Sequence, residues 1–188
     1  SSLQQEMKAQ LAEANEVISN NATQMSDMER QIEELRETVA AYESQGEAVP
    51  EQTAAYEALL AGYIAFAGND FLTAGVSLEQ VDRELLTENG KAIYDTVWPA
   101  VSETYFAQLY SNGYNSYTAG NYQEAITMLL SVVNQDKDYK NGNAIYYLAQ
   151  AYNRAGDMET ARPYYQYVID NYPNTEKART ARNYLKVQ

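Results

Sequence analysis

The sequence has no cysteine, no histidine and few glycines or prolines. Without Cys and His it cannot form disulfides, thiolate or imidazole catalytic arrangements, or zinc sites that depend on those ligands. Only 9 glycines and 4 prolines occur in 188 residues, and Val and Ile are sparse beside Ala, Leu, Gln and Glu, which favours helix. No run of about 18 apolar residues is present, so we expect no bilayer-spanning segment in this sequence.

Basic residues are also scarce, with 13 Lys and Arg against 26 Asp and Glu and a net charge of −13. Such a chain lacks the basic footprint of a protein that binds nucleic acid or an anionic membrane, so neither partner is expected. The charge is uneven: residues 1–50 hold 3 basic and 10 acidic side chains, 51–135 hold 2 and 10, and 136–188 hold 8 and 6. The C-terminal part is therefore slightly positive.

Motifs of the common enzyme classes are absent as well. The sequence has no GxSxG nucleophile elbow, no GxxxxGK phosphate loop and no GxGxxG fingerprint. The nearest approach to a metal-binding cluster, Asp136-Lys137-Asp138, lacks the glycine and the distal glutamate of a calcium loop and is predicted to be a solvated turn. We therefore predict a protein that is not an enzyme and that uses no cofactor and no metal.

Residues 1–43 carry six unbroken heptads, which indicate a coiled coil. We predict an oligomerisation helix that forms a parallel homo-oligomer, either a trimer or a dimer, with Asn21 setting register or strand number. The alternative is one long amphipathic helix that folds back on the downstream domain. The predicted oligomerisation residues are Leu11, Ile18, Asn21, Met25, Met28, Ile32, Leu35 and Val39.

Residues 44–50 break this pattern and are predicted to form a hinge. Pro50 can begin the next helix, because the N–H that proline lacks has no partner at that position. From residue 51 to residue 188 we expect a second domain built from helical repeats.

The most regular part of this domain is the stretch 142–173. Its small residues Ala149 and Ala161 let two antiparallel helices approach closely. Gly156 makes the turn between them, and Asp157 can cap the second helix. This alternation of small and large residues, closed by a proline, resembles one tetratricopeptide repeat.

The resemblance extends more loosely over the rest of 51–188. A turn, an aromatic residue and an alanine recur in step in AFAGNDFLTA and SYTAGNYQEA. The segment 89–105 fits no repeat; we predict a turn at Asn89-Gly90 and a kinked or restarted helix at Pro99. The expected fold is all-α, with the coiled-coil helix followed by a right-handed α-α superhelix. It comprises three repeats at about 55–88, 106–139 and 142–175 and a capping helix at 176–187.

If the fold resembles the family, certain places of each repeat's first helix face a concave groove. Many of the 18 tyrosines fall there, and tyrosine offers a stiff contact area with a polar tip, as binding surfaces favour. The alternative is that such tyrosines belong to the core, which is where we place Tyr122, Tyr152, Tyr165 and Tyr172. The predicted partner-binding residues are Tyr56, Tyr63, Phe66, Tyr110, Tyr114, Tyr117, Tyr146, Gln150, Asn153, Arg154 and Tyr184.

A coiled coil followed by a short repeat domain resembles the bacterial envelope proteins that trimerise and associate with the Tol–Pal machinery. The resemblance implies an extracytoplasmic, oligomeric scaffold. The sequence opens SSLQQ without Met, so we expect an upstream segment that tethers the protein to a membrane; a cytoplasmic location stays open. The predicted function is a non-catalytic adaptor whose groove binds a peptide or protein. The alternative is a structural spacer or self-assembly module without a groove ligand.

Overall fold

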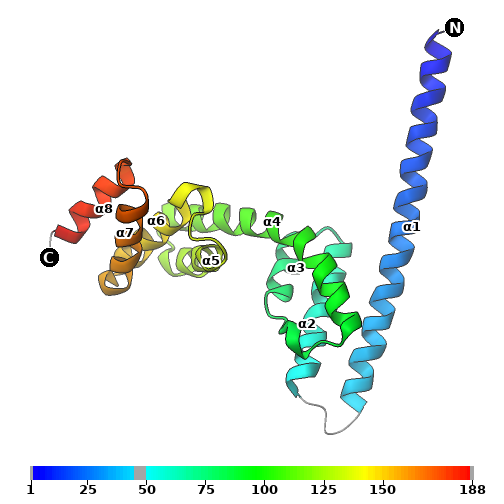
Figure 1. The fold of residues 1–188 in the computed structure, drawn as a ribbon, viewed down its shortest axis with the longest axis horizontal. Helices are drawn as coiled ribbons and strands as arrows, with labels where there is room; N and C mark the ends of the chain where they lie inside the picture. Colours follow the sequence, from blue (N-terminus) through cyan, green and yellow to red (C-terminus); the bar gives the residue numbers. More distant parts are fainter. Residues whose placement is uncertain (1, 45–49, 187–188) are drawn as a thin grey trace. The chain divides into compact units, whose positions relative to one another are not determined.

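The computed structural model describes residues 2–44 and 50–186, with side chains from residue 5 onward, and these residues are all-helical (Figure 1). They form eight α-helices and one 3-10 helix without any strand, which confirms the predicted all-α class. Contacts divide the chain into an N-terminal and a C-terminal unit, with the division between Ser102 and Glu103 inside α4. The helices are α1 (Ser2–Ser44), α2 (Pro50–Ala67), α3 (Phe71–Leu78), η1 (Arg83–Leu85), α4 (Glu88–Thr118), α5 (Tyr122–Gln135), α6 (Tyr139–Arg154), α7 (Met158–Asn171) and α8 (Glu176–Lys186).

In the N-terminal unit, the C-terminal part of α1 packs along α2. The Tyr42 ring lies 5.3 Å from the Tyr56 ring, centroid to centroid, and the Tyr63 hydroxyl donates a hydrogen bond to Gln31 Oε1. From the first contact to the second, the residue number falls from 42 to 31 along α1 and rises from 56 to 63 along α2. The two helices are therefore antiparallel. On α1, Leu35 lies between Gln31 and Tyr42 and is 2% exposed.

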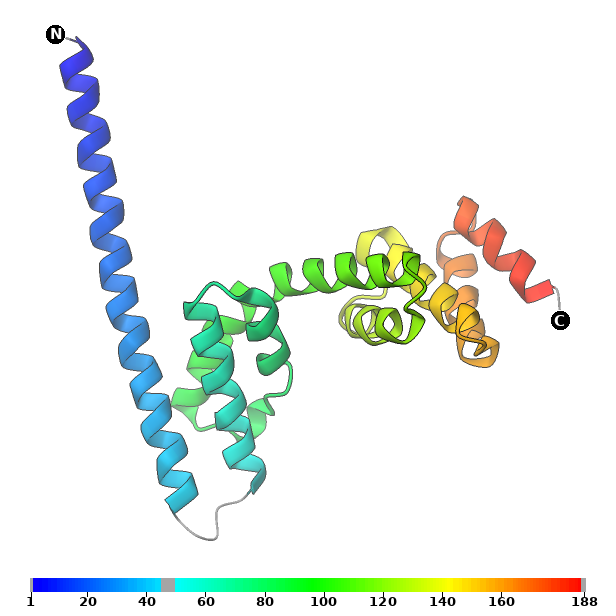
Figure 2. The ribbon, with the colours of Figure 1, turned by 180° about the vertical axis from the view of Figure 1, so that it is seen from behind.

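The N-terminal part of α1 extends beyond α2 (Figure 2), and its apolar residues are exposed. Leu11 and Met25 are each 62% exposed and Ile18 is 64% exposed. One heptad stripe therefore has two environments. Its last heptads pack on α2 of the same chain, as in the alternative of a helix that folds back on the downstream domain. Its first heptads are exposed. Self-association as a coiled coil stays a prediction. Of the predicted oligomerisation residues, Leu11, Ile18, Asn21 and Met25 are exposed, Met28 and Ile32 are half-buried, and Leu35 and Val39 are buried.

Helices α2 and α3 form the first repeat-like hairpin. A Cβ at Gly62 would lie 2.5 Å from Leu78 Cγ, so the glycine lets the two helices approach closely. The chain turns at Asn69, whose φ is 59°. Asp70 then caps α3, because its side chain accepts a hydrogen bond from the Thr73 amide at 3.0 Å. Pro50 begins α2 as predicted, whereas residues 45–49 of the predicted hinge lie outside the described residues.

The turn predicted at Asn89-Gly90 is wrong, because both residues lie in the first turn of α4. Gly90 meets a packing requirement instead: a Cβ there would lie 2.7 Å from the Tyr56 hydroxyl oxygen. Helix α4 continues through Pro99 to Thr118. It therefore contains both the segment 89–105 and the start of the second predicted repeat at residue 106.

In the C-terminal unit, the end of α4 and helices α5 to α8 pair in sequence order. A Cβ at Gly113 would lie 2.9 Å from Leu129 Cγ, which repeats the Gly62–Leu78 contact. Ala149, Ala161 and Ala181 are completely buried in one cluster, which lets α6, α7 and α8 approach closely.

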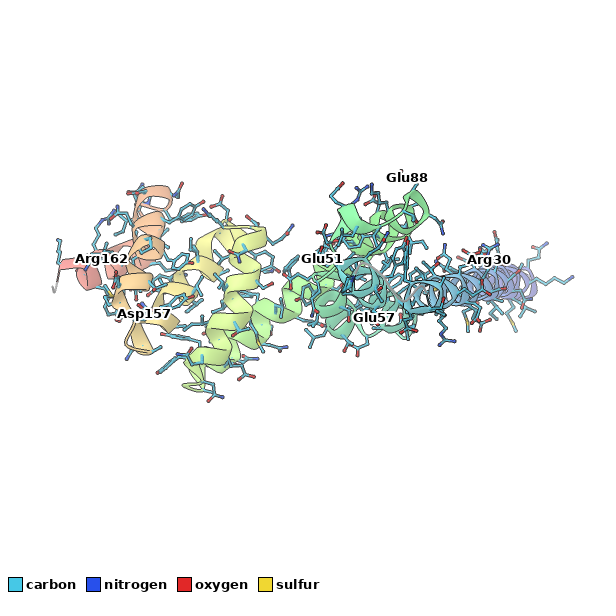
Figure 3. The ribbon with its side chains drawn as sticks, turned by 90° about the horizontal axis from the view of Figure 1, so that it is seen from below. Arg30, Glu51, Glu57, Glu88, Asp157 and Arg162 are labelled. Carbon is cyan, nitrogen blue, oxygen red and sulfur yellow. The ribbon has the colours of Figure 1, made fainter. Side chains whose placement is uncertain are left out.

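The predicted turn at Gly156 and the cap at Asp157 are both present. Gly156 has a φ of 89°, and the Asp157 side chain accepts a hydrogen bond from the Thr160 amide at 3.0 Å. Figure 3 labels Asp157 at this turn. The predicted capping helix is α8; residue 187, its predicted end, lies outside the described residues. Within the part of the chain that the structure describes, no helix combines the length and apolarity needed to cross a bilayer.

Candidate functional site

A continuous set of tyrosine rings occupies the C-terminal unit and comes from four helices. We call it the tyrosine surface. Ring centroids lie 4.7 Å apart for Tyr114 and Tyr147, 5.6 Å for Tyr117 and Tyr147, and 5.4 Å for Tyr146 and Tyr147. The set continues from Tyr146 through Tyr165 to Tyr184, with spacings of 6.5 Å and 5.3 Å. The tyrosine surface consists of Tyr114 and Tyr117 of α4, Tyr146 and Tyr147 of α6, Tyr165 of α7 and Tyr184 of α8.

The rings are exposed to different degrees. Tyr114 is 36% exposed and Tyr165 is completely buried, while the other four are half-buried. Burial and the neighbouring Tyr114 raise the pKa of the Tyr147 hydroxyl to about 12, and burial also raises the pKa of Tyr165. These hydroxyls are therefore protonated at neutral pH and can both donate and accept hydrogen bonds.

A buried amide lies between two of these rings. Gln150 of α6 is 3% exposed and is the only buried polar side chain in the described part of the chain. Its Nε2 donates to the Tyr146 hydroxyl at 3.0 Å, and its Oε1 accepts from the Tyr117 hydroxyl at 3.5 Å. A buried amide with both ends satisfied holds the two hydroxyls in place.

Two cations border the tyrosine surface. Arg154 is exposed, and the nearby Tyr184 and Tyr117 hydroxyls raise the pKa of its guanidinium. Lys177 of α8 places its Nζ 5.8 Å from the centroid of the Tyr146 ring. Among the described residues, neither cation forms a salt bridge. The surface can therefore offer aromatic area together with positive charge to a ligand.

Most of the predicted partner-binding residues of the second and third repeats are brought together here. Tyr114, Tyr117, Tyr146 and Tyr184 belong to the tyrosine surface, and Gln150 and Arg154 contact it. Asn153 joins it by donating to the Tyr165 hydroxyl at 3.3 Å. Tyr110 instead contacts Tyr139, with ring centroids 5.6 Å apart.

The predicted groove residues of the first repeat need correction. Tyr56 and Tyr63 are 2% and 4% exposed, so they belong to the core of the N-terminal unit and line no open groove. The physical reason is that α1 contacts both rings, through Tyr42 and Gln31. The Tyr56 hydroxyl is also held by Thr87, just before α4, at 2.6 Å. Phe66 is half-buried and contacts the rings of Tyr63 and Phe71.

Two residues of the site were not predicted, Tyr147 and Lys177. Tyr147 is adjacent to Tyr146 in the sequence and falls outside the places that the resemblance assigns to the groove, yet its ring contacts three others of the surface. Tyr165, predicted as core, is completely buried and also bridges Tyr146 and Tyr184. Contacts between neighbouring helices make these links, and no sequence spacing shows them.

The Asp136-Lys137-Asp138 segment holds the helices together. The Tyr167 hydroxyl donates to Asp138 Oδ1 at 3.0 Å, and the Tyr172 hydroxyl donates to the same oxygen. These two bonds lower the pKa of the Asp138 carboxyl. The described residues contain no group of three or more acidic, His or Cys side chains placed to hold a metal.

Searches for similar curated proteins and for similar solved structures found no match to the chain. A family model, that of the tetratricopeptide repeat, matches residues 143–175. The matched segment begins directly after the left-handed residues 140–142 and covers the rest of α6, α7 and the turn that follows. This part of the chain is therefore related to the tetratricopeptide-repeat family, which suggests a role in protein–protein interaction.

Proposed function

We propose that this protein is a non-catalytic adaptor that binds a peptide or protein on its tyrosine surface. The observation that supports the proposal is the continuous, partly exposed set of rings with Arg154 and Lys177 at its border. Aromatic residues and arginine dominate binding energy at protein interfaces, because they bury a large area at a low entropic cost. The absence of His and Cys from the sequence supports a function without catalysis.

The proposal includes self-association through α1. Its first heptads expose Leu11, Ile18 and Met25 on one stripe, and such a stripe is stabilised when it packs against other copies. Several linked tyrosine surfaces would bind a multivalent partner with higher avidity without any new contact. We further propose that the protein acts at the bacterial cell envelope, where it is tethered to a membrane. Fractionation of cells that express the full-length gene product tests this location, and recovery of all of it in the cytoplasm would contradict it.

The test of the binding function changes Tyr114 and Tyr117 to Ala and compares the proteins that co-precipitate from native envelope extracts. We expect the double variant to lose partners that the wild-type chain retains. Tyr164→Ala is the matched control, because Tyr164 is also half-buried but stacks on Tyr152, outside the tyrosine surface.

Circular dichroism should show that all these variants remain helical. An unchanged set of co-precipitated proteins from a folded double variant would contradict binding at this surface. That result would favour the alternative, a structural spacer whose long helix α1 separates an anchor from a repeat domain without a ligand.

A further inference from the structure

Within the N-terminal unit, helix α1 packs on residues of α2 that occupy groove places of the repeat. In the repeat register, Gly62 of α2 and Gly113 of α4 occupy the same place. The structure confirms this equivalence, because each glycine faces the equivalent leucine of the following helix, Leu78 or Leu129. The residues that follow the two glycines, Tyr63 and Tyr114, are therefore equivalent groove residues.

In the N-terminal unit, an amphipathic helix covers this face. Helix α1 reaches Tyr63 through Gln31 and Tyr56 through Tyr42, and it buries Leu35 between these contacts. It does not take the place of a preceding repeat: Ile64, next to Tyr63, is 40% exposed, whereas its equivalent in α6, Ala151, is completely buried. Helix α1 thus binds the groove places of α2 in particular.

In the C-terminal unit, the equivalent face is not covered by any described helix of its own unit to the same extent. Tyr114 is 36% exposed against 4% for Tyr63. The charges are complementary to a helix such as α1: residues 136–188 carry 8 basic and 6 acidic side chains, whereas residues 1–50 carry 3 and 10. Arg154 and Lys177 lie beside the rings where acidic flanks of a bound helix would come close.

We propose that the tyrosine surface binds an amphipathic helix of a partner protein, one with an apolar or aromatic stripe and acidic flanks, in the way that α1 binds α2. This inference rests on the proposed function and specifies the ligand class. Binding through an apolar helical stripe is one of the recurring modes of peptide recognition. The chain's own segment 24–44 has the required features, with the stripe Met28, Ile32, Leu35, Val39 and Tyr42, six acidic residues and two basic ones.

The test titrates the full chain into a fluorescently labelled peptide of residues 24–44 and follows fluorescence anisotropy. The tethered α1 has an effective concentration near the millimolar range at its own face, so a micromolar peptide will not displace it. We expect binding that Tyr117→Ala weakens at least about tenfold, as loss of a central aromatic contact does. Arg154→Glu should weaken binding several-fold, and more at low salt than at high salt. Since Arg154 is exposed, this second variant tests the idea without risk to the fold.

Two controls accompany these variants. Tyr164→Ala in the protein should leave the affinity unchanged, and a peptide with Leu35→Asp and Val39→Asp should not bind. Absence of binding, or binding that neither Tyr117→Ala nor Arg154→Glu weakens, would contradict the proposal. If the peptide fails while the Tyr114 and Tyr117 variants still lose partners from extracts, the groove function stands and the helical ligand class is wrong. Self-association of the full chain that Tyr117→Ala abolishes would identify a second copy's α1 as the occupant and would contradict a separate partner.

Discussion

The tyrosines of the C-terminal unit are of two kinds, those that are buried in the fold and those whose rings are partly exposed. Tyr165 is completely buried and packs among small residues of α6, α7 and α8. Tyr172 occupies the space above Gly142 and donates a hydrogen bond to Asp138. Tyr114, in contrast, leaves much of its ring exposed. Because a buried ring stabilises the fold and an exposed ring is available to a ligand, changes at these two kinds of position should have different consequences.

Gly142→Ala is predicted to destabilise the C-terminal unit strongly. Gly142 has a φ of 75°, and a Cβ there would lie 2.3 Å from the Tyr172 ring. We expect a loss of about 2–4 kcal/mol in the free energy of unfolding, from backbone strain of roughly 1 kcal/mol and the displacement of the ring. Urea denaturation followed by circular dichroism measures this loss.

Gly156→Ala is the matched control for this prediction. Gly156 has a φ of 89°, but a Cβ there would meet no atom within 4 Å. Only the backbone strain applies, so the expected loss is about 1 kcal/mol. Equal losses in the two variants would show that Tyr172 does not restrict residue 142.

At the scale of single elements, α1 is the helix whose role depends most on its surroundings. Its heptads continue without a break, although Gln4, Ala14 and Asn21 weaken the seam of the first half. Leu35 is nevertheless 2% exposed and Leu11 is 62% exposed. The six heptads were evident from the sequence alone. The surface that the last two heptads pack on was not evident from the sequence. Tyr56 and Tyr63 of α2 have the pattern of groove residues, and this pattern does not indicate that α1 covers them. A heptad pattern shows that a stripe needs burial and does not show which surface buries it.

Leu35→Ala and Leu11→Ala are predicted to have different effects. Leu35→Ala removes a buried side chain and should destabilise the N-terminal unit by about 2–4 kcal/mol. Leu11→Ala removes an exposed one and should leave the intrinsic stability of that unit nearly unchanged. The fluorescence of Trp98, the single tryptophan, reports unfolding of this unit. A similar loss in both variants at low protein concentration would contradict the difference in burial.

At the scale of the whole molecule, the proposed assembly depends on the exposed part of α1. The acidic residues are concentrated before residue 136 and the basic ones after it. Removal of residues 1–50 would be a poor test of self-association, because it would also remove Tyr42 and Gln31, which contact Tyr56 and Tyr63 of α2. Substitutions confined to the exposed heptads keep the N-terminal unit intact.

The combined variant Leu11→Asp and Ile18→Asp is therefore predicted to abolish self-association without unfolding either unit. The two aspartates remove the apolar burial that stabilises a coiled coil and place two unpaired negative charges on the seam of each copy. Sedimentation equilibrium should find an oligomer for the wild-type chain and a monomer for the variant. Glu13→Gln and Glu16→Gln, on the same segment but off the seam, should remain oligomeric. A monomeric wild-type chain would contradict the coiled-coil assembly.

The sequence by itself determined the all-α class, the long first helix, the turns in AFAGNDFLTA and at Gly156 and the small residues at the helix contacts. These features depend on local preferences and on periodicity, which can be read along the chain. The tertiary structure decided which tyrosines are buried and which are open. Tyr63 and Tyr114 hold equivalent places, but within their own units α1 covers Tyr63 while no described helix covers Tyr114 to the same extent. This difference follows from a contact between distant segments. Local sequence does not show such a contact, and for that reason it did not predict that the open tyrosines lie in the C-terminal unit.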